Sequence, residues 1–117
     1  MINIHILLAS GRLNNSESKI RQAAEEGITK IKNKIVVDNI DIVIRDNPPG
    51  AIPEIGIGGY ALDPHYISIS LDPDFPDFNS AIVNELSRTL AHEFHHALRM
   101  RDLGYGETLL EALVTEG

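Results

Sequence analysis

Isoleucine and leucine alternate with polar residues at the start of the chain and then recur at helical spacing, which predicts a strand followed by a helix. The segment 2–8 is rich in β-branched residues and is typical of a β-strand. We expect Ser16 to cap a helix that runs to about Lys34, with Ser10 and Ser18 as competing start signals. Its apolar residues recur every three or four positions and should face a sheet; they are Ile20, Ala23, Ala24, Ile28 and Ile31.

The middle of the chain predicts further extended segments separated by turns. The segment from Val36 to Arg45 alternates isoleucine with polar residues in its second half, as a half-buried strand does. The stretch from Gly56 to Leu62 is rich in glycine, which suits a loop or an exposed edge strand. The segment from Tyr66 to Leu71 alternates again and predicts another strand.

A long helix is predicted after the acidic, proline-containing loop 72–77. We expect its N-cap at Asn79 or Ser80 and its end near Arg101, a length of roughly 23 residues or ~35 Å. One stripe of this helix should be buried; it consists of Ile82, Leu86, Leu90, Ala97 and Met100 or Arg101.

Two glycines end this helix, and a last helix follows. Gly104 and Gly106 are the stop signals, and the new helix begins near Glu107. The resulting order β-α-β-β-β-α-α predicts an α+β fold with a small mixed sheet of three to four strands, as one domain over residues 1–117.

Composition excludes several classes of function. The 117 residues are 43% hydrophobic, enough for a core, and they include no cysteine, which excludes disulfide scaffolds and thiol nucleophiles. The net charge of −7 argues against nucleic acid as a partner. No apolar run approaches the ~20 residues of a membrane span. The start of the chain lacks the basic region of a signal peptide, so we expect a cytoplasmic protein.

The long helix carries the sequence His92-Glu93-Phe94-His95-His96, which contains the motif H-E-x-x-H. His92 and His96 are one turn apart, so both imidazoles can reach one Zn²⁺ at about 2.0–2.1 Å. Glu93 lies about 100° further round the helix, where it can accept a proton from a metal-bound water. Two histidines leave such a site under-coordinated, so a third protein ligand is expected.

This motif and the end of the chain resemble a family of zinc enzymes. The residues are Leu90-Ala91-His92-Glu93-Phe94-His95-His96-Ala97-Leu98-Arg99 and Leu110-Glu111-Ala112-Leu113-Val114-Thr115-Glu116-Gly117. They are similar to the gluzincin metallopeptidases, and closest to the minigluzincins and related small predicted zinc-dependent proteases. The resemblance implies a zincin-like fold with a backing helix, an active-site helix and a C-terminal glutamate helix.

The resemblance also implies a third zinc ligand. Gluzincins use a glutamate on a second helix, about twenty residues beyond the motif. Glu116 lies at that distance and is followed by glycine, whereas Glu111 is the second choice. Glu116 is the penultimate residue, so we consider a C-terminally truncated protein, a covering second chain that implies self-association, or ordering by the metal itself.

Peptidases of this kind hold their substrate as an extra strand on a sheet edge. The glycine-rich segment 56–62 is our candidate for that edge, with Gly58, Gly59 and Tyr60 as substrate-binding residues. A loop without a ligand role is the alternative interpretation.

The sequence therefore predicts a zinc-dependent metallopeptidase that hydrolyses peptide or protein substrates through a metal-bound water activated by Glu93. The main alternative is a non-catalytic or latent zinc module with a closed metal site. Two histidines and a carboxylate also suit Fe(II), although such a site has no need of Glu93 as a base. The remaining alternative is an interaction protein in which the motif is fortuitous.

Overall fold

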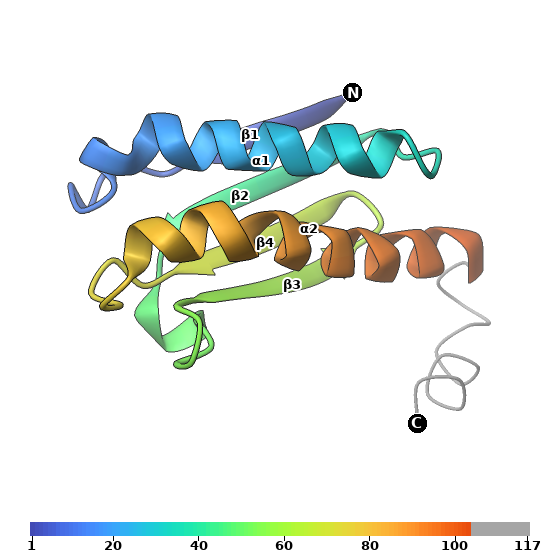
Figure 1. Cartoon of the computed structure of the whole chain (residues 1–117). Coiled ribbons are helices and arrows are strands. Elements are labelled where there is room, and N and C mark those ends of the chain that lie inside the picture. The colour runs from blue at the N-terminus through green and yellow to red at the C-terminus, as the bar shows by residue number, and fades with distance from the viewer. Residues whose placement is uncertain (104–117) are drawn as a thin grey trace.

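A single four-stranded mixed sheet carries two helices on one of its faces (Figure 1). The computed structural model describes residues 1–103. Its elements in chain order are β1 (Ile2–Ile6), α1 (Glu17–Lys32), β2 (Ile40–Asp46), β3 (Ile57–Asp63), β4 (Tyr66–Leu71) and α2 (Phe78–Leu103), with 3₁₀ turns at Asn14–Ser16 and Pro48–Gly50. The α+β class, the mixed sheet and the order of these elements are confirmed.

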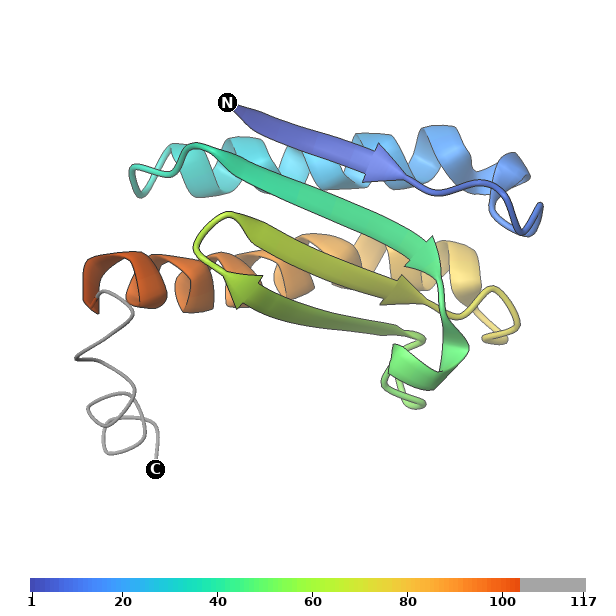
Figure 2. The same cartoon turned by 180° about the vertical axis from the view of Figure 1, so that it is seen from behind.

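The strands lie in the order β1-β2-β4-β3. β1, β2 and β4 are parallel, and β3 runs antiparallel to β4 at one edge of the sheet. The glycine-rich segment is therefore an edge strand and not a loop. Figure 2 shows the opposite face of the sheet, which no helix of the described residues covers.

The core lies between the sheet and the helices, and the alternating isoleucines of the strands supply one side of it. Ile40, Ile42 and Ile44 of β2 are buried, while Asp41 and Arg45 between them are exposed. The predicted stripe of α1 is buried throughout, and the stripe of α2 is buried from Ile82 to Ala97. The pattern of apolar positions thus identified the faces of the elements correctly.

The starts of β2 and α2 differ from those predicted, whereas α1 starts where predicted. β2 begins at Ile40, not at Val36, because Val36 is 84% exposed and Asn39 has a left-handed backbone (φ 59°) that interrupts an extended segment. α2 begins at Phe78, so Asn79 lies inside its first turn and does not cap it. Ser16 does precede α1, but its hydroxyl makes no capping hydrogen bond.

α1 and α2 approach each other closely at Gly27. A Cβ atom there would lie 3.1 Å from Cα of Ser87 on α2. Glycine inside a helix costs about 1 kcal/mol relative to alanine. Here it lets two helices pack against one another over the sheet. No helix among the described residues is long and apolar enough to cross a membrane.

Arg12, which follows β1, is hydrogen-bonded to the end of β2 and to the loop before α2. Its guanidinium donates to both carboxylate oxygens of Asp46, at 2.8 and 3.2 Å, and to Asp74 at 2.9 Å. Asp46 ends β2, and Asp74 lies in the acidic loop before α2. The hydrogen bonds from Arg12 lower the pKa of the Asp46 carboxyl, although partial burial opposes this shift.

We expect Arg12→Gln to lower the melting temperature near neutral pH by about 2–5 °C. Because Arg12 depresses the pKa of Asp46 in the folded state, its contribution is fully present above the unfolded pKa of about 3.9. The contribution is lost as the pH falls through the folded value. Thermal melts of both proteins should therefore converge only once the pH has fallen below the depressed folded-state pKa of Asp46. If the two melting temperatures differed equally at all pH values, the stabilisation would not come from the pairing of Arg12 with Asp46.

Candidate metal centre

α2 brings the two histidines of the motif together on one flank. Nε2 of His92 lies 3.1 Å from Nε2 of His96, and the ring centroids are 4.7 Å apart at an interplanar angle of 80°. Both side chains come from the same helix one turn apart, so the spacing follows directly from helical geometry. The predicted convergence of the two imidazoles is present.

The separation of the two nitrogens suits a shared divalent cation. Two imidazole nitrogens at about 2.0–2.1 Å from a tetrahedral zinc ion are roughly 3.3 Å apart. The 3.1 Å between the Nε2 atoms of His92 and His96 is close to this value. Neutral imidazole nitrogens are also a donor type that zinc prefers. The donor pair therefore fits Zn²⁺.

Glu93 lies between the histidine pair and the core. Its side chain is only 8% exposed, whereas that of His92 is 68% exposed. Its Oε2 lies 3.9 Å from Nε2 of His92. A nearly buried carboxylate thus stands beside an open pair of imidazoles, which is the arrangement that a positioned general base requires.

The edge strand β3 holds Glu93 in place through Gly59. A Cβ atom at Gly59 would lie 2.8 Å from Cγ of Glu93 and 2.9 Å from Cγ2 of Thr89. Such distances are too short for carbon atoms, so only glycine permits this contact between β3 and α2. Thr89 was not predicted from the sequence, although it lies one turn before Glu93 and so shares its face of the helix.

We expect Gly59→Ala to reduce the rate of the peptide hydrolysis predicted from the sequence by about 100-fold. The new methyl group must displace the Glu93 side chain, and a shift of about 1 Å costs a factor of this size. The measurement is kcat together with a thermal melt. Val36→Ala, which shortens an 84% exposed side chain away from β3, is the control and should leave kcat nearly unchanged. A full rate in Gly59→Ala would show that this contact does not position Glu93.

The outer edge of β3, the one away from β4, presents backbone groups next to this site. The N–H of Asp72 donates to the carbonyl of Gly56, and the N–H of Ile52 donates to the carbonyl of Ile57. In an antiparallel pair, the backbone groups of successive residues point alternately toward the partner strand and away from it. The N–H and C=O groups of Gly59 and Ala61 therefore point away from β4. Those of Gly58 and Tyr60 point toward β4.

Comparison with known proteins gives a family for this arrangement. Residues 20–117 match DUF2268, which is described as a predicted Zn-dependent protease family. The chain belongs to this family. A search of curated proteins found no match, and a search of solved structures found none either.

Glu111 and Glu116, the two glutamates predicted from the sequence as candidates for a third zinc ligand, lie outside the described residues, as does the predicted helix end at Gly104 and Gly106. Within residues 1–103, no group of three or more His, Asp or Glu side chains comes together as a metal site. His92 and His96 are the part of the predicted ligand set that the structure describes.

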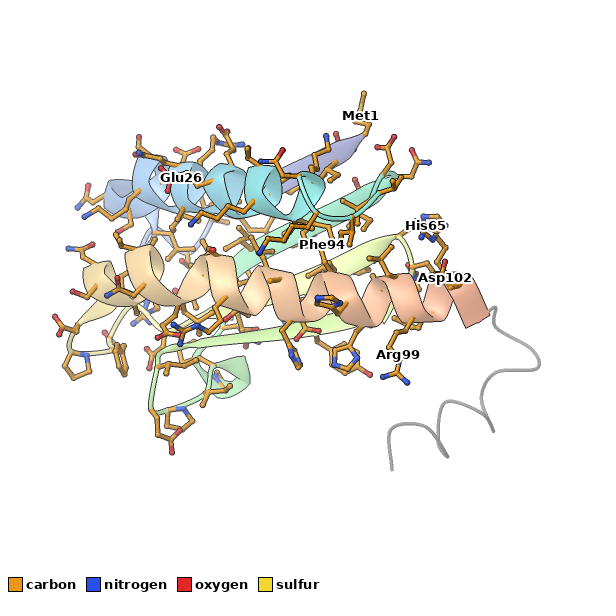
Figure 3. The ribbon with its side chains drawn as sticks, turned by 45° about the vertical axis from the view of Figure 1, so that its right-hand side comes forward. Met1, Glu26, His65, Phe94, Arg99 and Asp102 are labelled. Carbon is orange, nitrogen blue, oxygen red and sulfur yellow. The ribbon has the colours of Figure 1, made fainter. Side chains whose placement is uncertain are left out.

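The third histidine of the segment 92–96 faces another part of the molecule. His95 lines a hollow of about 690 Å³ between α1 and α2, together with Gly27 and Ser87. Neither His92 nor His96 lines this hollow, so the His95 side chain lies toward α1 and the histidine pair does not. Phe94, labelled in Figure 3, is fully buried beneath α2. Nδ1 of His65, in the turn between β3 and β4, lies 2.8 Å from the carbonyl oxygen of Asn39.

Proposed function

We propose that this DUF2268 chain is a zinc metallopeptidase of the gluzincin type, closest to the minigluzincins. His92 and His96 would hold the zinc ion, and Glu93 would act as the general base. The observation that carries the proposal is the pair of Nε2 atoms 3.1 Å apart with the nearly buried Glu93 carboxylate beside them. Membership of a predicted Zn-dependent protease family supports it independently.

Glu93 and Gly59 would have different roles in this hydrolysis. A bound zinc ion would lower the pKa of a water molecule toward 7 and polarise the carbonyl group of the peptide bond. Glu93 would accept a proton from the attacking water and then deliver it to the leaving amine nitrogen. Contact with Gly59 limits the motion of Glu93, so that the carboxylate stays in reach of both groups.

The substrate would bind as an extended segment along the outer edge of β3. The outward N–H and C=O groups of Gly59 and Ala61 can hydrogen-bond with a peptide backbone, as in strand addition. Gly58 is buried against the carbonyl oxygen of Gly50, so a larger side chain would collide there, and Tyr60 is exposed on the open face of the sheet. This recognition uses the backbone, so it suits peptides or proteins in an extended conformation.

We propose Glu116 as the third zinc ligand, with Glu111 as the second choice. The test is the zinc content and zinc affinity of the full chain, measured by mass spectrometry and by competition with a chelator. We expect one zinc ion per chain, loss of peptide hydrolysis when zinc is removed, and an affinity at least about 100-fold lower in Glu116→Ala. Glu111→Ala is the matched control and should bind zinc normally.

Different results would reject different parts of this proposal. If only Glu111→Ala lost zinc affinity, Glu111 would be the third zinc ligand in place of Glu116. Zinc binding without hydrolysis of any peptide in a mixed library would indicate the non-catalytic zinc module. Failure to bind any divalent metal would reject the metal centre itself.

A further inference from the structure

The outer edge of β1 carries a row of backbone groups that no described residue pairs with. β1 stands at the end of the sheet and pairs with β2 on its inner side. The N–H of Ile40 donates to the carbonyl of Met1, and the N–H of Leu7 donates to the carbonyl of Ile44. The backbone N–H and C=O groups of the odd-numbered residues of β1 thus point toward β2. The N–H and C=O groups of the even-numbered residues point outward; these are Ile2, Ile4 and Ile6.

This edge lacks the features that keep strands from pairing with other chains. Natural edge strands are commonly blocked by lysine, proline or a β-bulge. The sequence of β1, Ile-Asn-Ile-His-Ile, contains none of them. The edge at β3, by contrast, has a register shift between Ala61 and Asp63 and a bridge from Ile52 to Ile57. The two edges of the sheet are therefore not equivalent.

A hollow beside β1 offers space for the side chains of an added strand. It has a volume of about 490 Å³ and lies between β1 and α1. Ile2, Ile4 and Ile28 give it an apolar floor. The charged residues around it are two cations and one carboxylate, Arg21, Lys32 and Glu25. In a chain with a net charge of −7, this side is not acidic, so two copies can approach here without concentrating their negative charge.

We propose that two copies of this chain associate through antiparallel pairing of their β1 strands. The strand is complementary to itself when Ile4 lies opposite Ile4 of the second copy and Ile2 lies opposite Ile6. In this register, Ile2, Ile4 and Ile6 all form hydrogen-bonded pairs, with two bonds in each pair. Every outward backbone group of β1 then has a partner, and the two sheets join into one of eight strands.

The same register also places compatible side chains on both faces. The isoleucines of the two copies meet on the helix side and close the hollow beside α1. On the open face, Asn3 meets His5 of the second copy, and neither carries a fixed charge. The paired edge lies across the sheet from β3, so the metal centre of each copy stays accessible.

Sedimentation of the full chain over a range of concentrations tests this proposal together with amide hydrogen exchange. We expect the mass to rise from 12.9 kDa toward twice this value, with half-association at about 10–100 μM, as for a small interface. The amides of Ile2, Ile4 and Ile6 should become at least about tenfold more protected as the dimer forms. The amides of Asn3, His5 and Gly59 should not change, because they face β2 or the other edge.

Two variants separate backbone pairing from side-chain packing. Ile4→Pro removes an outward N–H, keeps every hydrogen bond to β2 and should raise the dimer dissociation constant by more than about 100-fold. Ile4→Ala loses the same side chain but keeps the N–H, and should raise it by about tenfold or less. A monomer at all concentrations up to about 500 μM would overturn the proposal. So would a dimer whose new protection lies at β3 or at the helices.

Discussion

Replacing Glu93 by glutamine is expected to lower kcat/KM for peptide hydrolysis by about 10³-fold while the zinc content stays at one ion per chain. The amide has nearly the same shape as the carboxylate, but it cannot accept a proton from water, and general base catalysis contributes about 10²–10⁴-fold. Glu93 is nearly buried against Gly59, so the glutamine should occupy the same position.

Glu85→Gln is the matched control for this experiment. Glu85 lies on the same helix, partly exposed, and its carboxylate oxygens are 3.4 and 3.5 Å from Nη1 of Arg88. We expect this variant to keep kcat/KM within about twofold, since exposed ion pairs contribute little. Full activity in Glu93→Gln would reject Glu93 as the base. Loss of zinc in the same variant would instead place Glu93 among the metal ligands.

Replacing His92 by alanine is expected to lower the zinc affinity by more than about 100-fold and to abolish hydrolysis. Structural zinc sites of four ligands bind with about 10–16 kcal/mol, so the loss of one ligand removes roughly 3 kcal/mol. The His92 side chain is 68% exposed, so its removal leaves the core intact. Zinc titration of the metal-free protein, with a thermal melt of the same sample, measures both quantities.

His95→Ala is the control that the motif itself provides. His95 is exposed and lines the hollow between α1 and α2, whereas the Nε2 atoms of His92 and His96 converge outside that hollow. We expect its replacement to leave the zinc affinity and kcat within about twofold of the unchanged protein. An equal loss of zinc in His95→Ala and His92→Ala would show that the helix binds metal through a different pair of histidines.

The identity of the elements and their buried faces were predictable from the sequence. Isoleucines at every second position in 40–44 and apolar residues at every third or fourth position in 82–97 specify which side of a strand or helix is buried. The same local geometry placed His92 and His96 together, because a spacing of four on a helix brings two side chains to one face.

Boundaries and contacts between distant segments were not predictable in this way. Val36 has a high strand propensity, yet the left-handed Asn39 lies between it and β2. The glycine-rich segment could be read as a loop or as an edge strand until pairing with β4 identified it as an edge. The unblocked edge of β1 likewise became apparent only from the order of the strands.

By itself, the sequence determined the α+β class, the buried stripes and the two histidines with their neighbouring glutamate, because each depends on spacings within one element. The tertiary structure alone decided that β3 lies against α2 at Gly59, where a methyl group would collide with Glu93. Such a contact joins residues that are far apart along the chain. No local periodicity encodes it, because it arises from how the sheet and helix pack.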